Sequence, residues 1–173
     1  YHLVVPSLSN HSDGIISPNM PKWLRRLGNV VVPGQPKQTR KIFLTRKDAT
    51  NRNISNQEQL VLALKGWEQV TLESLTLTQQ VKIFKEASHI LSPHGAGLVN
   101  TLWCQPGTKV IELQHRKFID KKVYPILSYH LGLDHKVYLA KSNKINNPKP
   151  KNKKSKDMVD LEINIPELLK FLD

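Results

Sequence analysis

The segment from Ser92 to Asn100 combines the residue types that bind a phosphate group. It reads Ser-Pro-His-Gly-Ala-Gly-Leu-Val-Asn and follows an apolar run that ends at Leu91. Gly95 and Gly97 carry no side chain, so a ligand can approach their backbone N–H groups closely. A helix expected to begin near Gly97 would direct unpaired N–H groups and its positive dipole end at the same place. These features favour a phosphate site over a merely tight turn.

Other residues of this loop extend the candidate site. His94 can donate a hydrogen bond to a phosphate oxygen, and Asn100 stands one turn along the expected helix. Ala96 and Leu98 complete the segment. The loop also nearly matches the dinucleotide fingerprint, but Asn100 stands where Gly or Ala is required and several strand–helix units precede it. A nicotinamide-dependent oxidoreductase is therefore disfavoured.

A second loop carries two arginines. Arg46 directly follows the apolar run of residues 42–44, and Arg52 stands six residues later, before a helix start signal. Two guanidinium groups suit a diphosphate, because each can hold two of its oxygens. The alternative is a pair of solvated surface arginines.

Glu112 ends the apolar run that begins at Val110. A carboxylate at the carboxyl end of a strand can accept hydrogen bonds from both ribose hydroxyls of a nucleotide. A capping or salt-bridging role is equally compatible with the sequence.

Short apolar runs and helix-like patterns alternate along the chain, and these elements must position the two loops. The runs are continuous rather than alternating, as in strands that are covered on both faces. We expect strands at Leu3–Val5, Val30–Val32, Ile42–Leu44, Val70–Leu72, His89–Leu91, Val110–Leu113 and Lys136–Leu139.

Helix signals lie between these runs. Ser55 and Glu58 have the spacing of a capping box before a helix that ends at Gly66, and Thr78 is expected to cap the next helix. Further helices are expected near Pro21–Leu27, over Gly97–Trp103 and Lys121–Leu131, and from Pro166 to Leu172.

The alternation of strands and helices predicts an α/β fold with a doubly wound parallel sheet. We divide the chain into a loop-rich part (1–40), a Rossmann-like domain (41–140), a Lys/Asn-rich flexible insertion (141–157) and a C-terminal helical segment packed on the domain (158–173). Ligands of such sheets bind beyond the carboxyl ends of the strands, where both candidate loops are expected.

The net charge of +12 suggests an anionic partner, but it is unevenly spread. Seven lysines and no acidic residue fall between Lys141 and Lys156, and the remaining chain has 19 basic and 14 acidic residues. This tract lacks aromatic residues that could stack on bases, so a solvated loop is favoured over a nucleic-acid or membrane-surface site. The single cysteine, Cys104, excludes an internal disulfide and a cysteine-based zinc cluster.

Taken in order along the chain, these motifs resemble the signature of glycosyltransferase family 61. The resemblance runs from about Pro6 to Leu113, and more weakly through the last helix. Two features depart from the pattern, the residue type at Trp67 and the lysine-rich insertion, and neither touches the core motif. The matching residues are Thr45-Arg46, Arg52–Glu58, Gly66–Val70, Gln80, Phe84, Ala87, His94–Leu98, Asn100, Pro106-Gly107 and Val110–Glu112.

The resemblance implies a GT-B architecture, in which this chain is the Rossmann-like C-terminal domain that holds the nucleotide and an N-terminal half is missing. It also implies inverting transfer from a donor such as UDP-N-acetylglucosamine or UDP-xylose to a protein- or polysaccharide-linked acceptor. By matching position, Glu112 becomes a candidate ribose or structural contact. The other candidate donor-binding residues are Arg46, Arg52, His94, Gly95, Ala96, Gly97, Leu98 and Asn100.

No Asp-x-Asp motif occurs in the sequence. Paired arginines and a helix dipole can neutralise a leaving UDP in place of a divalent cation, so we expect no cofactor and no metal. The expected partners are a UDP-sugar, a glycan or glycoprotein acceptor and the missing N-terminal half, and not nucleic acid. His11 or Asp13 could act as the general base, but the missing half could equally supply it, so none is assigned.

Two further functions compete with this one. Use of the His-Gly-Ala-Gly segment as an esterase oxyanion loop requires a Gly-x-Ser-x-Gly elbow, which the sequence lacks. A nucleotide-sugar-binding domain without activity of its own stays open, because a single Rossmann-like domain cannot form a two-domain cleft. The compartment is open too: the lumen of the ER or Golgi in a eukaryote, the cytoplasm or membrane in a bacterium.

Overall fold

The computed structural model describes residues 19–45, 53–115, 122–143 and 160–172. Its helices are α1 (Asn19–Val31), α2 (Gln57–Ala63), the 3₁₀ helix η1 (Leu72–Ser74), α3 (Leu77–Glu86), the 3₁₀ helix η2 (Ala96–Trp103), α4 (Val123–Leu131) and α5 (Ile165–Leu172). Its strands are β1 (Arg40–Thr45), β2 (Glu68–Thr71), β3 (Ala87–Pro93), β4 (Lys109–His115), β5 (Asp134–Asn143) and β6 (Asp160–Glu162). The strand expected at Leu3–Val5 and most of the 141–157 insertion lie outside the described residues.

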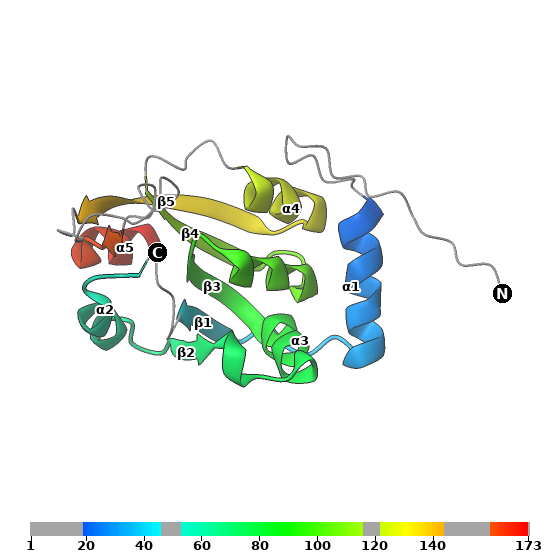
Figure 1. The fold of residues 1–173 in the computed structure, drawn as a ribbon. Helices are drawn as coiled ribbons and strands as arrows, with labels where there is room; N and C mark the ends of the chain where they lie inside the picture. The colour runs from blue at the N-terminus through cyan, green and yellow to red at the C-terminus, as the bar shows by residue number, and fades with distance from the viewer. Residues whose placement is uncertain (1–18, 46–52, 116–121, 144–159, 173) are drawn as a thin grey trace, which may run out of the picture.

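The described strands form one sheet in the order β2-β1-β3-β4-β5-β6 (Figure 1). Strands β1 to β5 pair in parallel, and β6 pairs with β5 in the antiparallel direction. The predicted α/β class is confirmed, with a sheet that is mostly rather than wholly parallel. The sequence did not reveal β6, because three residues are too few to show a periodic pattern.

Helices cover both faces of this sheet. Ile90 and Val110 face a core that they share with α1, α3, η2 and α4. Leu91 and Ile111, one residue further along each strand, face a second core shared with α2 and α5. Side chains alternate between faces along a strand, so Glu112 belongs to the face covered by η2 and α4.

The apolar runs predicted as strands within β1, β3, β4 and β5 are confirmed. In the run at Val70–Leu72 the strand ends at Thr71, and Leu72 begins η1. The prediction of a strand at Val30–Val32 is wrong. Val30 and Val31 lie in the last turn of α1, and the Val32 N–H donates to the Gly28 carbonyl at 2.9 Å.

A buried lysine explains why a β-branched run can end a helix here. Lys85 of α3 is 3% exposed, and its Nζ donates to the carbonyl oxygens of Val32 and Gly34 and to Oδ1 of Asn29. It therefore satisfies backbone carbonyl groups of the residues that follow α1, and it holds Asn29 in the last turn of the helix. Tertiary contacts of this kind outweigh the weak preference of valine for strands.

Both predicted helix caps are displaced. Ser55 does not cap α2, because its Oγ donates to the Leu161 carbonyl at 3.1 Å, and Asn56 is the residue that precedes the helix. For α3 the cap is Thr76 rather than Thr78: Thr76 and Gln79 form a reciprocal capping box. The cap lies one residue later than predicted at α2 and two residues earlier at α3, which is the usual uncertainty of a predicted helix boundary.

The remaining helices follow the expected order. The helix predicted near Pro21–Leu27 is confirmed as α1, which extends beyond the predicted range at both ends. The helix predicted over Gly97–Trp103 is present as the 3₁₀ helix η2. Gly132 ends α4 in the left-handed conformation at φ 68°, as its position after the helix predicts. Among the described residues, no helix has the length and apolar character needed to span a bilayer.

Candidate functional site

The strand order places a topological switch point between β1 and β3. From this pair of neighbouring strands the chain continues outward in opposite directions, to β2 on one side and to β4 on the other. In a sheet of order 2-1-3-4-5, ligands bind at the carboxyl ends of the strands at this point. Strand β1 ends at Thr45, directly before Arg46, and β3 ends at Pro93, directly before His94. The two strands that precede the predicted loops therefore end on either side of this switch point.

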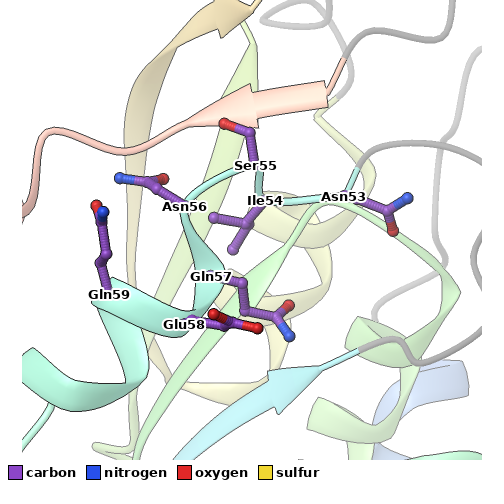
Figure 2. Close-up of a pocket in the computed structure, with 7 residues that line it drawn as sticks. All are labelled: Asn53, Ile54, Ser55, Asn56, Gln57, Glu58 and Gln59. Atoms are coloured by element: carbon purple, nitrogen blue, oxygen red, sulfur yellow. The ribbon is translucent and has the colours of Figure 1, made fainter.

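Arg46 and Arg52 themselves lie outside the described residues. The segment that follows Arg52, from Asn53 to Gln59, lines a polar hollow of about 530 Å³ (Figure 2). Asn56 exchanges hydrogen bonds with the backbone of Ile163, at 2.8 and 3.0 Å, and so fixes one wall of the hollow.

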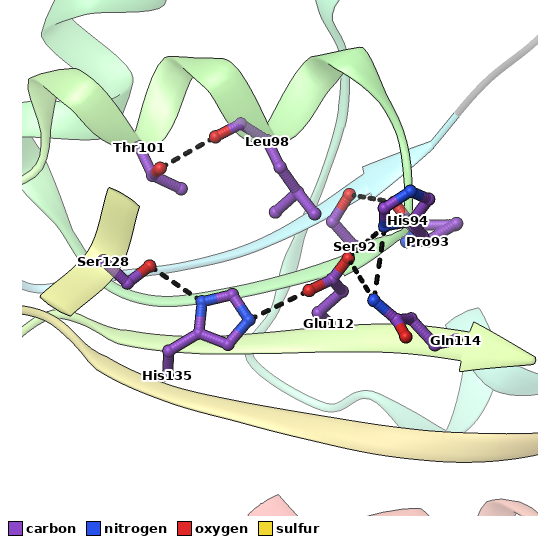
Figure 3. A network of polar contacts seen from close by, with 9 residues as sticks. All are labelled: Ser92, Pro93, His94, Leu98, Thr101, Glu112, Gln114, Ser128 and His135. Carbon is purple, nitrogen blue, oxygen red and sulfur yellow. Dashed lines mark hydrogen bonds and ion pairs between the residues drawn. The ribbon is translucent and has the colours of Figure 1, made fainter. Parts of the chain in front are cut away.

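His94 is held against Glu112 at the start of the glycine-rich loop (Figure 3). Its backbone N–H donates to the Leu113 carbonyl at 2.9 Å, and its Nδ1 forms a short hydrogen bond with Oε1 of Glu112. The ring packs edge-on against Tyr124, with 5.3 Å between centroids. The side chain is 10% exposed, and no described residue forms a hydrogen bond with Nε2. Nε2 is thus the ring atom that can meet a ligand.

Glu112 is fully buried, and both of its oxygens accept hydrogen bonds. Burial alone would raise the pKa of its carboxyl group, but hydrogen bonds from His135, His94 and Gln114 outweigh this effect and lower the pKa to about 2. Glu112 is therefore an anion at neutral pH. With its oxygens occupied, it is placed to orient His94, and this geometry favours the structural alternative over a ribose contact.

The residues after His94 differ in what they present to a ligand. Ala96 is exposed, whereas the side chain of Leu98 is fully buried in the core, so Leu98 can offer only backbone groups. The first hydrogen bond of η2 runs from the Leu98 N–H to the Gly95 carbonyl at 3.0 Å. The amides of Gly95, Ala96 and Gly97 precede it, and they are the donors that a phosphate could use.

Gly97 and Asn100 have further structural contacts. A Cβ atom at Gly97 would lie 3.1 Å from Cδ1 of Leu72, so the glycine also permits close packing. The Asn100 amide bridges its own helix: Nδ2 donates to the Gly97 carbonyl at 3.4 Å, and Oδ1 accepts from Nε1 of Trp103 at 3.1 Å. A direct contact of Asn100 with a diphosphate stays a prediction.

Three residues of the site were missed by sequence reasoning. Gln114 donates to Oε1 of Glu112 at 2.9 Å, His135 contacts Oε2 at 3.0 Å, and Ser128 contacts Nδ1 of His135 at 2.7 Å. Gln114 could have been predicted from the sequence. It follows Glu112 by two residues in the same strand, so the two side chains lie on the same face of the sheet. His135 and Ser128 come from β5 and α4, and only the alignment of β5 with β4 brings them into reach.

The assembled loop offers an imidazole edge and backbone amides, all of which are suited to an anion. Among the described residues, no group of three or more His, Cys, Asp or Glu side chains is placed to hold a metal ion.

Comparison with known proteins places this chain in a family. The family model described as Glycosyltransferase 61 matches residues 1–111, well over half of the chain. The chain belongs to glycosyltransferase family 61. The matched part contains the His94 loop and the strand up to Ile111, one residue before Glu112.

Curated relatives share shorter stretches with this family 61 chain. The human protein O-linked-mannose beta-1,4-N-acetylglucosaminyltransferase 2 is 41% identical over 68 residues, which is 36% of this chain and 12% of the human protein. The proteins of the same name from Takifugu rubripes and Tetraodon nigroviridis are 34% and 36% identical over 70 residues, 38% of this chain and 12% of each relative. The matched region thus spans about an eighth of the length of these relatives.

Proposed function

We propose that this chain is the nucleotide-sugar-binding half of an inverting glycosyltransferase of the GT-B type. The observation that carries the proposal is the position of the His94 loop at the β1–β3 switch point, in a chain of glycosyltransferase family 61. Residues 41–140 form the donor-binding domain in this proposal, and a second domain from another part of a longer protein completes the cleft.

The site binds the diphosphate of a UDP-sugar. The amides of Gly95, Ala96 and Gly97 and Nε2 of His94 meet its oxygens from the β3 side of the crevice. Arg46 and Arg52, which follow Thr45 of β1 in the sequence, supply two positive charges to it in this proposal. Two cations and a set of backbone amides provide the donors that a diphosphate requires.

These donors also support the chemical step. The acceptor hydroxyl attacks the anomeric carbon of the sugar, its C–O bond forms as the bond from carbon to the diphosphate oxygen breaks, and the hydroxyl proton passes to a general base. Negative charge develops on the leaving UDP, and the arginines and His94 stabilise it there. The attack from the side opposite UDP inverts the configuration at carbon.

The names of the relatives favour one donor and one acceptor. The three relatives are named for transfer of N-acetylglucosamine to O-linked mannose on protein. UDP-N-acetylglucosamine is therefore the first donor to test, with UDP-xylose as the second, and a mannosylated peptide is the first acceptor.

The short matched region favours a second candidate function. The matched region spans 12% of each relative, so the acceptor site and the general base can lie in other parts of such a protein. In that case this chain binds a nucleotide-sugar without activity of its own. Product release from UDP-N-acetylglucosamine by this chain, and by a longer protein that contains it, separates binding from turnover.

Thermal unfolding with a panel of nucleotides and nucleotide-sugars tests the proposed function. A ligand at about 100 times its Kd stabilises the fold by about 2.7 kcal/mol. UDP and UDP-sugars are expected to raise Tm more than AMP, NAD or inorganic phosphate at the same concentration. Equal shifts for all anions, or none for UDP-sugars, would remove the nucleotide-sugar assignment.

A further inference from the structure

A line of buried polar contacts runs from His94 into the domain (Figure 3). Oε2 of Glu112 lies 3.0 Å from Nε2 of His135, and Nδ1 of His135 lies 2.7 Å from Oγ of Ser128. The side chains of His135 and Glu112 are 5% and 0% exposed. His135 therefore cannot meet a ligand at the surface, although it shares a carboxylate with a residue that can.

The chemistry of these groups fixes the place of each proton. An ionised carboxylate only accepts hydrogen bonds, so Nε2 of His135 and Nδ1 of His94 must both carry hydrogen. In the neutral His135 ring, Nδ1 is then an acceptor, and the Ser128 hydroxyl donates to it. Ser128 thus holds His135 in the tautomer that donates to Glu112.

The orientation of the Gln114 amide follows from its contact with the Glu112 carboxylate. Its Nε2 donates to Oε1 of Glu112 at 2.9 Å, while its own Oε1 is buried without a hydrogen-bond partner among the described residues. Turning the amide around would bring Oε1 against the carboxylate, so the cluster leaves one polar atom unsatisfied in order to hold Glu112. A buried polar atom without a partner is uncommon in a folded protein, so the contact with the carboxylate sets the orientation of the Gln114 amide.

We propose that His135 is a positioning residue for nucleotide binding, which acts on His94 through Glu112. The inference rests on the proposed function, because His94 is the group expected to contact the diphosphate. His135 holds one oxygen of the carboxylate, which leaves the other oxygen directed at Nδ1 of His94. A proton is thereby held on Nδ1 of His94. Nε2 has no hydrogen-bond partner among the described residues, and it donates to a phosphate oxygen when the ring is doubly protonated.

Residues that orient a metal-binding imidazole from behind commonly change metal affinity by about tenfold or more when they are replaced, and we expect an effect of similar size for an imidazole that binds a phosphate. His135→Leu removes the donor to Glu112 and is expected to raise the Kd for UDP by about tenfold. His135→Gln keeps an N–H donor at the corresponding position and is expected to restore most of the affinity. His89→Leu is the matched control. His89 lies on β3, where its ring packs against Trp67, and it takes no part in the cluster around Glu112.

A double-mutant cycle separates positioning from general destabilisation. If His135 acts through His94, then His135→Leu costs no further UDP affinity in a His94→Ala background. The second readout is the ¹H NMR signal of the His94 Nδ1–H, recorded without nucleotide. It is expected in the wild type and in His135→Gln, and it is expected to broaden or disappear in His135→Leu.

The outcomes distinguish this inference from the proposed function. Equal UDP affinity in the wild type and His94→Ala would overturn the site on which both depend, whatever the NMR signal shows. A loss in His94→Ala together with an additive loss in the double variant, or an unchanged Nδ1–H signal in His135→Leu, would overturn the positioning role alone.

Discussion

Cδ1 of Leu72 lies 3.1 Å from the point at which a side chain at Gly97 would begin. Gly97 thus lies at a close contact between η2 and the segment that follows β2. The same glycine stands at the start of η2, where a ligand could approach its amide. Substitutions at Gly97 therefore disturb packing as well as any phosphate site, and stability must be measured alongside affinity.

Gly97→Val is expected to destabilise the fold, because its added methyl groups collide with Leu72. Overpacking of this kind costs about 1–3 kcal/mol. Urea unfolding measures the loss. Leu72→Ala in the same chain should recover part of it, since the collision is then removed.

Ala96→Val is the matched control for this glycine substitution. Ala96 is exposed and immediately precedes Gly97, so its replacement should leave stability within about 0.5 kcal/mol. A Gly97→Val protein as stable as the Ala96→Val protein would show that Leu72 does not limit the space at this glycine.

The arginine loop makes a separate prediction. Arg46→Ala and Arg52→Ala are each expected to weaken UDP binding by about 1.5–3 kcal/mol, because each removes a charge-assisted contact to the diphosphate. Arg26→Ala serves as a control for lost positive charge, since Arg26 is exposed on α1. Calorimetry in which all three variants bind UDP as the wild type does would exclude the arginine loop from the site.

Glu112 predicts a specific response of stability to acid. Burial alone would raise its pKa, but its hydrogen bonds lower the pKa from the ordinary value of 4.5 to about 2 in the folded chain. A carboxylate whose pKa falls on folding stabilises the fold above its unfolded pKa, and this contribution is lost as the pH falls toward the folded pKa.

Comparison of the wild type with Glu112→Gln isolates this contribution. The stability advantage of the wild type should narrow by about 2 kcal/mol between about pH 6 and pH 3, because only the wild type has a carboxylate to protonate. Urea unfolding at both pH values provides the measurement. A difference that stays constant, or widens in acid, would contradict the lowered pKa of Glu112.

Metal removal tests how the diphosphate charge is neutralised. The sequence has no Asp-x-Asp motif, and the proposed donors are arginines, His94 and backbone amides. EDTA is therefore expected to leave the Kd for UDP unchanged within about twofold, a difference below about 0.5 kcal/mol. Affinity that falls in EDTA and returns with Mn²⁺ or Mg²⁺ would show that a cation takes part.

The central strands were predictable from local sequence because they are buried on both faces. Ile42–Leu44 in β1 and the Ile90-Leu91 pair in β3 are continuous apolar segments, and such segments stand out without knowledge of the fold. Val30–Val32 has the same local pattern but ends a helix, because Lys85 and other distant residues decide its conformation. Local pattern alone cannot separate these cases.

The candidate site divides in the same way. Its glycine-rich loop is contiguous, so the spacing of His94, Gly95 and Gly97 was enough to propose it as a phosphate site. The support of His94 is not contiguous: Glu112 lies on β4 and His135 on β5, and parallel pairing of these strands brings them together. A sequence pattern gives the type of each residue but not this alignment, so the buried cluster required the structure.

The place where the nucleotide binds tests the central claim most directly. Backbone amide signals of ¹⁵N-labelled protein, recorded during titration with UDP, report the site residue by residue. The largest changes are expected at the backbone amides of His94, Gly95, Ala96 and Gly97, with little change in α1, which lies at the margin of the molecule (Figure 1). Millimolar UDP that leaves the His94 loop unchanged, or that shifts signals only elsewhere, would contradict the account.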